Sequence, residues 1–276
     1  MPQIFVDGHV HIHPSFSLKD LFGSAYRNVC AHHPDTQPAP DCLFLLLTES
    51  AGAHVFATLQ KELAAGRLRP DGFVLEATAE AYTLVCRDGS GIPLYLVAGR
   101  QIVTAERLEV LALGYKDPFP DGQPINEVLQ ELAAQGCVLV LPWGAGKWLG
   151  KRGKKVEELI GQAQAGQFFL GDNANRPFFW PLPDLFARAQ ARGIRNLAGS
   201  DPLPFPGQER KAGSFGVQLT GALDPAHPFA ALRDLLLNPA TALTPFGRCE
   251  QLYPFFKHQI SMQLHKKSSS SPASCS

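Results

Sequence analysis

The sequence lacks an excess of charge of either sign. Its 25 Lys and Arg residues are balanced by 25 Asp and Glu residues, so the formal net charge at pH 7 is zero. Proteins that bind nucleic acid or anionic membranes through general attraction usually carry a basic surface. From this balance we expect no nucleic-acid partner and no membrane partner.

Paired cysteines and long apolar runs are also missing. The six cysteines are scattered and form no C-x-x-C pair, which excludes the common zinc-finger and redox motifs. No run approaches the roughly 18 apolar residues that a membrane helix needs, and the N-terminus does not resemble a secretory signal. Scattered cysteines are typical of a reducing compartment. We therefore expect a soluble, cytoplasmic protein.

What the sequence does contain is a histidine-rich strand end. The apolar residues 4–6 are followed by Asp7-Gly8-His9-Val10-His11-Ile12-His13. An apolar run with β-branched and aromatic residues is typical of a buried strand, and alternate residues of a strand project to the same side. Imidazole is the commonest protein ligand of transition metals. The pattern predicts a metal site at this strand end, and the alternative is a set of histidines that only form hydrogen bonds.

Apolar strands and amphipathic helices alternate along most of the remaining chain. Further strands are expected at 42–47, 138–141, 168–170 and 194–198, and helices at 18–29, 53–65, 125–134, 156–165, 182–192, 228–237 and 252–265. This alternation favours a mainly parallel sheet covered by helices, an α/β fold that can close into a barrel of seven or eight strands. A β-rich insertion around 73–113 interrupts the pattern. Residues 1–265 are expected to form a single domain, and 266–276 a disordered Ser-rich tail.

Polar residues recur where the predicted strands end. Glu49 follows strand 42–47, and Asp201 follows strand 194–198. The carboxyl ends of barrel strands meet at one rim, so these carboxylates are predicted to lie near the histidines. Two histidines and a carboxylate suit a divalent metal ion that activates water for hydrolysis. The alternative role for Glu49 and Asp201 is to cap the helix or turn that follows each.

Several of these segments, in chain order from about Phe5 to Gly216, resemble motifs of the PHP (polymerase and histidinol phosphatase) family of hydrolases. His9-Val10-His11 is similar to the first motif, H-x-H, and Gly199-Ser200-Asp201 to the last. Thr48-Glu49-Ser50 is similar to the second motif, with Ser50 in place of a histidine. Gln101 replaces a bridging glutamate of the third motif, and Glu109 replaces a histidine that follows it.

The resemblance implies a distorted TIM-like (β/α)7 barrel of the PHP type and metal-dependent hydrolysis of a phosphoester or related small molecule. A neutral amide at Gln101 cannot offset the repulsion between two cations, so we expect one divalent ion (zinc, manganese or iron) rather than a cluster of three. The ligands implied are His9, His11, Asp201 and Gln101, and Glu49 or Glu109 is the expected catalytic proton acceptor. The alternative is a catalytically inactive PHP-like protein that binds a ligand or partner.

A basic loop supplies candidates for substrate binding. Residues 144–155 contain four glycines and five Lys or Arg residues, between a predicted strand and a predicted helix. The spacing does not match a Walker A motif, but Lys147 in such a loop can bind a phosphate or carboxylate. The alternative is a solvated loop. Trp143, Asn173 and Arg176, near neighbouring strand ends, are the other predicted substrate-binding residues.

Overall fold

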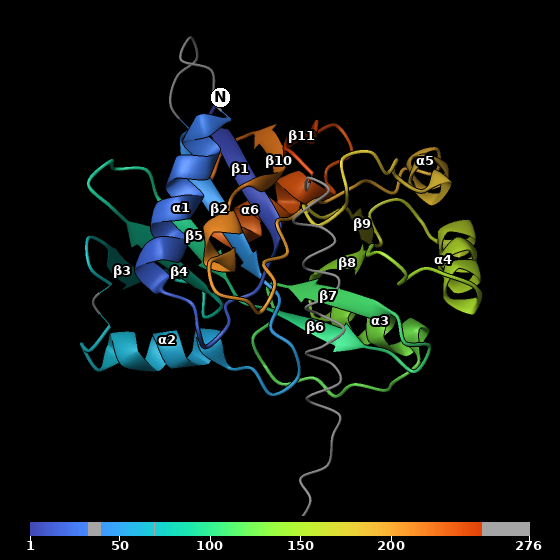
Figure 1. Ribbon diagram of the computed structural model, residues 1–276, viewed down its shortest axis with the longest axis horizontal. Helices are drawn as coiled ribbons and strands as arrows, with labels where there is room; N and C mark the ends of the chain where they lie inside the picture. The colour runs from blue at the N-terminus through green and yellow to red at the C-terminus, as the bar shows by residue number, and fades with distance from the viewer. Residues whose placement is uncertain (33–39, 69, 250–276) are drawn as a thin grey trace, which may run out of the picture.

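The computed structural model describes residues 1–32, 40–68 and 70–249, which form two β-sheets with helices packed around them (Figure 1). The larger sheet has the strand order β11-β10-β1-β2-β5-β4-β3, and the smaller sheet has the order β6-β7-β8-β9. The fold is therefore of the mixed α/β class that the alternating pattern predicts.

The elements have the following bounds. The strands of the larger sheet are β1 (Gln3–Val10), β2 (Cys42–Leu47), β3 (Val74–Ala77), β4 (Thr83–Arg87), β5 (Leu94–Val97), β10 (Phe215–Thr220) and β11 (Thr244–Gly247); those of the smaller sheet are β6 (Gly99–Val103), β7 (Glu109–Leu113), β8 (Val138–Pro142) and β9 (Phe169–Gly171). The helices are α1 (Leu18–Ala31), α2 (Val55–Ala64), α3 (Ile125–Ala134), α4 (Lys151–Gln162), α5 (Asp184–Gln190) and α6 (Pro228–Leu237), with a short 3₁₀ helix η1 (Gln208–Lys211).

The described strands do not form one closed barrel sheet. The β1–β2, β2–β5 and β8–β9 pairs are parallel, whereas β1–β10, β10–β11, β3–β4, β4–β5, β6–β7 and β7–β8 are antiparallel. The predicted, mainly parallel arrangement is thus wrong for much of the molecule. Four of the six antiparallel pairs involve β3 to β7, the β-rich region at 73–113 that folds back on itself through short connections, and the other two involve β10.

Isolated bridges join the two sheets where a further strand was expected. Segment 194–201 makes single parallel bridges to the β9 side, pairing Leu170 with Asn196 and Asn173 with Gly199. On its other side the segment contacts β1, where the Gly8 N–H donates to the Ala198 carbonyl over 2.9 Å. A parallel bridge between Glu49 and Arg100 likewise links the end of β2 to β6. Short irregular contacts therefore replace the regular ladder predicted for residues 194–198.

Two glycines permit the close approach of segment 194–201 to β1. A Cβ atom at Gly199 would lie 2.2 Å from the His9 nitrogen, and one at Gly8 would lie 2.8 Å from the Ala198 carbonyl oxygen. Side chains at these positions would hold the two backbones apart. The glycines thus allow the His9 backbone to pack directly against the chain that leads to Asp201.

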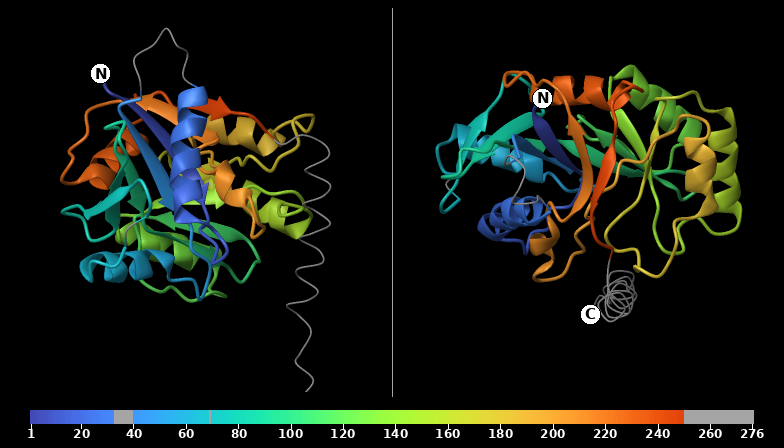
Figure 2. Two further views of the ribbon diagram at one scale, coloured as in Figure 1. Left: turned by 60° about the vertical axis from the view of Figure 1, so that its left-hand side comes forward. Right: turned by 90° about the horizontal axis from the view of Figure 1, so that it is seen from above.

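Helix α1 covers one face of the larger sheet (Figures 1 and 2). It begins after Ser17, whose hydroxyl accepts the Asp20 N–H over 3.2 Å as an N-cap. Leu21, Phe22 and Val29 recur on its buried face and pack with β-strand residues of the larger sheet in one apolar cluster. This packing fixes the loop between β1 and α1, which carries His11 and His13.

Apart from shifts of a few residues at other element ends and the irregular segment 194–201, the structure differs from the predicted elements mainly at α4, β10 and β11. Helix α4 begins at Lys151 rather than 156, because its first turns are basic and hold no buried apolar residue to reveal the helical period. Strands β10 and β11 were not predicted, because their sequences, FGVQLT and TPFG, contain no long apolar run. The predicted helix 252–265 and tail 266–276 lie outside the described residues.

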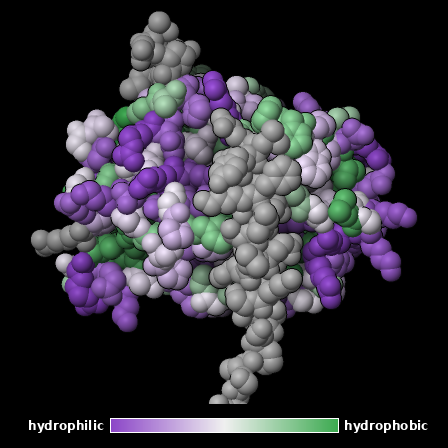
Figure 3. All heavy atoms as spheres, in the orientation of Figure 1, coloured by the Kyte–Doolittle hydropathy of each residue, from purple (hydrophilic) through white to green (hydrophobic). Residues whose placement is uncertain are grey.

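The described part of the chain contains no helix that is both long and apolar enough to cross a membrane. In the space-filling view, the outer faces of α1 and α4 are largely hydrophilic, and hydrophobic surface shows between α1 and α2 (Figure 3).

Candidate metal centre

Three predicted ligands lie together at the carboxyl end of β1. The Nε2 atoms of His9 and His11 are 3.1 Å apart, and the Asp201 Oδ1 lies 3.5 Å from the first and 3.6 Å from the second. Among the described residues, His9, His11 and Asp201 form a group whose ligand atoms all lie within 4.8 Å of one another. We call these three residues the metal group. The fold therefore brings together three residues that the sequence analysis named, although Asp201 lies 190 positions after His11 in the sequence.

The three ligand atoms have the spacing of one face of a metal coordination shell. The circle through them has a radius of about 2.0 Å, by arithmetic from their three separations. Zinc lies about 2.0–2.2 Å from imidazole nitrogen and carboxylate oxygen, so one ion just outside the plane reaches all three. Two histidines and a carboxylate also form the donor set expected for zinc, manganese or iron.

Burial keeps both imidazoles in the form that binds metal. Burial, and then the neighbouring His9, lower the pKa of His11 to about 3. Burial likewise lowers the pKa of His9, against the opposing effect of Asp201. Burial by itself would raise the pKa of Asp201, but the two histidines and Lys147 outweigh it and lower that pKa below its usual range. Two neutral imidazoles and an ionised carboxylate are the protonation states that a divalent ion requires.

Asp7 joins the two segments that carry the ligands, a role that the sequence analysis missed. Its buried carboxylate accepts the N–H groups of Ser200 and Gly213 over 2.8 Å each, and that of His9 over 3.3 Å. Burial raises the pKa of Asp7 to about 7. The available signal was a carboxylate placed directly after the apolar run of β1. Asp7 thus fixes the backbone beside both His9 and Asp201.

Asn175 and Lys211 support Asp201 from its other side. The Asn175 side-chain amide donates to the Asp201 carbonyl over 2.7 Å, and the Lys211 ammonium donates to the Asn175 Oδ1 over 2.5 Å. Asp201 has a left-handed backbone with φ of 46°, which is uncommon for a residue other than glycine. Lys211 also helps to lower the pKa of Asp201. No sequence motif marked Lys211, which lies on the short helix η1.

Gln101 and His13 flank the group in different ways. Gln101 lies close enough to His9 to affect the pKa of that imidazole. Its Oε1 atom is buried and has no hydrogen-bond partner among the described residues, which fits the predicted additional ligand. His13 instead has its Nε2 atom 3.2 Å from the Pro202 carbonyl oxygen, with its ring stacked on His11. His13 therefore supports the ligands and is not one of the three.

Lys147 and Glu109 form an ion pair within the electrostatic reach of the group. The Lys147 ammonium donates to the Glu109 Oε2 over 2.5 Å. Burial would lower the pKa of Lys147, but the carboxylates of Glu109 and Asp201 raise it more. The same two residues also affect the pKa of His9. The structure thus brings a predicted proton acceptor and a predicted anion-binding residue to the metal group.

Both oxygens of Glu49 are engaged by groups other than the three candidate ligands. Oε1 accepts the Phe56 N–H over 2.6 Å at the start of α2, and Oε2 lies 3.0 Å from the Arg100 guanidinium. Arg100 is itself buried and donates to the carbonyl groups of Ala53 and Lys116. The geometry is that of a helix-capping carboxylate in a buried ion pair, which matches the alternative role that the sequence left open for Glu49. Its role as a catalytic proton acceptor stays a prediction.

The other predicted substrate-binding residues are used within the protein. Trp143 is buried in the apolar cluster of the smaller sheet, and its carbonyl accepts the Asn173 amide over 2.8 Å. Arg176 makes two 2.9 Å hydrogen bonds to Asp172 and a further one to the Trp180 carbonyl. These contacts already use the Asn173 amide and the Arg176 guanidinium within the protein. Substrate binding by these three residues stays a prediction.

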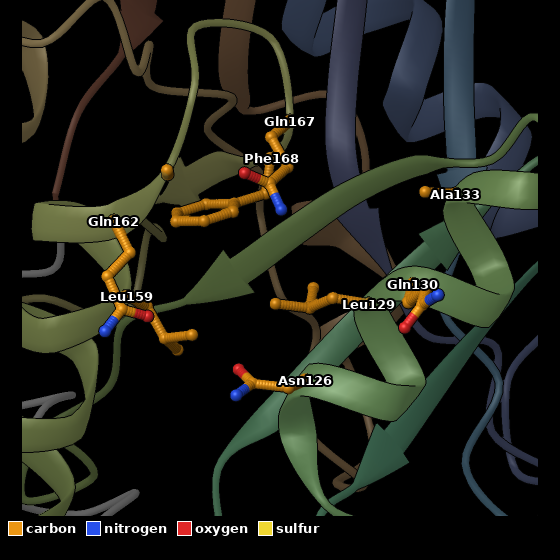
Figure 4. A pocket seen from close by; sticks show the side chains of 9 residues that line it. Asn126, Leu129, Gln130, Ala133, Leu159, Gln162, Gln167 and Phe168 are labelled. Carbon is orange, nitrogen blue, oxygen red and sulfur yellow. The ribbon is translucent and has the colours of Figure 1, made fainter.

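A groove between α3 and α4 lies apart from the ligands described above (Figure 4). It has a volume of about 430 Å³, and Leu129, Leu159 and Phe168 contribute apolar side chains to it. None of the three candidate ligands lines this groove.

Comparisons with known proteins show what this fold is similar to. No protein-family model and no curated protein matches the chain. The structure resembles that of PsfC from Pseudomonas syringae PB-5123, with a TM-score of 0.55 and 16% identity over 97% of this chain and 99% of that one. It also resembles the lesion-specific endonuclease PfuEndoQ from Pyrococcus furiosus, with a TM-score of 0.51 and 11% identity, covering 88% of this chain and 57% of that one. At such identities the likeness is one of fold.

The similarity to an endonuclease corrects one expectation. Zero net charge led us to exclude a nucleic-acid partner, yet a lesion-specific endonuclease shares this fold. Net charge is a property of the whole chain, whereas binding to nucleic acid depends on the charge of one surface. The exclusion of nucleic acid is therefore wrong as an argument from composition.

Proposed function

We propose that this protein is a divergent PHP-type metal-dependent hydrolase that uses one divalent metal ion to cleave a phosphoester or related substrate. The triangle of His9, His11 and Asp201, with ligand atoms 3.1–3.6 Å apart, is the observation that carries this proposal. The irregular contacts that join β9, segment 194–201 and β1 are consistent with a strongly distorted barrel. The fold shared with an endonuclease adds support for hydrolysis of phosphoesters.

Each neighbouring side chain then has a distinct role in the proposed reaction. His9, His11 and Asp201, with Gln101 as an additional ligand, would hold a divalent ion, which would supply a Lewis acid that lowers the pKa of a water molecule. Lys147 attracts the anionic group of the substrate, and Glu109 is the proton acceptor, held in place by its ion pair with Lys147. Lys211 adds positive charge beside Asp201. We assign Glu49 to capping of α2 rather than to catalysis.

Elemental analysis of protein purified without a polyhistidine tag tests the metal site directly. We expect about one zinc, manganese or iron ion per chain, lost in Asp201→Ala. Asp224→Ala is the matched control, because Asp224 is an exposed carboxylate paired with a histidine, His227, as Asp201 is with His9. Equal metal content in the wild type and both variants would contradict the site.

Hydrolysis is tested separately on the metal-loaded protein with phosphomonoesters and phosphodiesters, short oligonucleotides among them. Turnover that is lost in Asp201→Ala supports the hydrolase. A protein that holds one metal ion but turns over none of these substrates would favour the alternative, a PHP-like protein that binds a ligand without catalysis. That alternative is favoured by one observation: both predicted proton acceptors are in ion pairs, Glu49 with Arg100 and Glu109 with Lys147.

A further inference from the structure

A cavity of about 520 Å³ opens beside the metal group, and His11 belongs to both. One side of the cavity is formed by the β1–α1 loop and the start of α1, and the other by segment 49–59, which includes the first turns of α2. Its size falls within the range of small-molecule sites in proteins.

The cavity is lined largely by apolar side chains. Ile12, Pro14, Phe16 and Leu18 line it from the first side, and Val55 and Leu59 from the second. Two of its polar residues are already engaged, since Glu49 caps α2 and pairs with Arg100, and His13 contacts the Pro202 carbonyl. The cavity therefore offers apolar contact and few charge-assisted hydrogen bonds to a ligand.

The cationic residues near the metal group lie outside this cavity. Lys147 and Lys211 both act on the pKa of Asp201, yet neither lines the cavity. The surroundings of the three ligands thus differ in character, with positive charge near Asp201 and an apolar cavity beside His11. A substrate that spans both regions needs an anionic group and an apolar group on neighbouring atoms.

We propose that this cavity binds the apolar substituent of the substrate, an aryl or branched alkyl group, while the phosphoryl group of the same molecule lies at the metal and near Lys147. This inference rests on the proposed function and narrows its substrate class to hydrophobic phosphoesters. The volume of about 520 Å³ accommodates a benzene ring with space to spare.

Binding of two phosphonates to the zinc-loaded protein tests the inference without requiring turnover. Phenylphosphonate and methylphosphonate carry the same anionic group and differ in the apolar substituent. Isothermal titration calorimetry is expected to show phenylphosphonate binding about tenfold or more tightly, because the ring is transferred from water to an apolar site. Methylphosphonate affinity reports on the metal and the cationic residues alone.

Two variants on the same helix locate the preference. Thr58 lines the cavity and Ala57, the preceding residue, is exposed and does not. Thr58→Phe should fill the space and bring the two phosphonate affinities close together, while methylphosphonate affinity stays within about twofold and so shows that the protein is folded. Ala57→Phe should keep the wild-type preference.

The outcomes separate this inference from the proposed function. If methylphosphonate binds in a zinc-dependent way but the wild type shows no preference for phenylphosphonate, the metal centre stands and the cavity assignment is overturned. A preference that survives in Thr58→Phe would place the apolar contact elsewhere and also overturn it. If zinc is not retained, the metal centre itself fails, and the cavity assignment fails with it.

Discussion

The Nε2 atoms of His9 and His11 face each other at 3.1 Å, and burial lowers the pKa of both imidazoles. Two protonated imidazoles at this distance would repel each other strongly. The neutral pair instead points two nitrogen atoms at the space beside the Asp201 carboxylate. In the metal-free protein this arrangement carries a cost that depends on pH, and the cost can be measured.

The first prediction concerns acid destabilisation of the metal-free protein. The pKa of His11 is about 3 in the folded state, against 6.5 for an ordinary histidine. As the pH falls below 6.5, the unfolded chain takes up a proton that folded His11 does not, so the free energy of unfolding falls. Between pH 6.5 and 4.5 this contributes a loss of about 2 kcal/mol.

Urea unfolding at several pH values, with a chelator present, measures this effect. Asp7 acts in the opposite direction, because burial raises its pKa to about 7, so the informative quantity is the difference between variant and wild type. His11→Gln should show a shallower fall in stability with acid than the wild type. His227→Gln, at an exposed histidine, should not. Identical pH profiles for His11→Gln and the wild type would show that His11 is not held neutral.

The second prediction separates a structural role of Glu49 from a catalytic one. Glu49→Gln should lower the free energy of unfolding by about 3 kcal/mol, because it leaves buried Arg100 without its anionic partner. Glu62→Gln is the matched control on α2, since Glu62 pairs with Arg67 at the surface, where water screens the pair, and this change should cost far less stability than Glu49→Gln. Zinc content should be unchanged in both variants. Loss of turnover by Glu49→Gln at wild-type stability would restore the catalytic assignment.

The third prediction concerns anion binding at Lys147. Lys147→Gln should weaken the binding of inorganic phosphate to the zinc-loaded protein about tenfold, since one charge-assisted hydrogen bond is removed. Zinc content is expected to persist, because Lys147 is not one of the three ligands. Lys116→Gln, at a more exposed lysine beside Asp117, should bind phosphate as the wild type does. Calorimetric titration gives both affinities, and equal values would remove Lys147 from the site.

The fourth prediction tests the close approach that places Asp201. A methyl group at Gly199 would lie 2.2 Å from the His9 backbone nitrogen, so Gly199→Ala must push two backbone segments apart. We expect a loss of about 3 kcal/mol in stability and weaker zinc binding. Gly161→Ala, in α4 with open space around the added methyl group, should instead add about 0.5–1 kcal/mol. Wild-type zinc affinity in Gly199→Ala would show that the approach does not position the ligands.

The sequence predicted that the three candidate ligands lie together, because each stands at the end of an apolar run. His9 and His11 follow from the alternation of side chains along β1, and Asp201 follows from the convergence of strand ends at one edge. What could not be predicted is how Asp201 reaches them. Segment 194–201 makes bridges and single hydrogen bonds instead of a regular strand, and that depends on glycine contacts with residues far along the chain.

The other predicted site residues have contacts that the sequence does not reveal. The sequence does not reveal whether a carboxylate such as Glu49 is free or ion-paired, because its partner Arg100 lies 51 positions away. Trp143 and Arg176 were placed near strand ends correctly, but their tertiary contacts use the groups that a substrate would need. Local patterns therefore located the neighbourhood of the site, whereas tertiary contacts decided which side chains face it.

The hydrogen bond from the Asp201 N–H to the His9 carbonyl, 2.8 Å long, joins residues that lie 192 positions apart in the sequence. Contacts so distant in sequence form only after long stretches of polypeptide have been ordered, so this one has a high loop-closure cost. A metal ion that requires both residues has no complete site in a partly folded chain. Metal uptake should therefore follow the docking of segment 194–201 against β1, and the kinetics of zinc binding during refolding should report that late step.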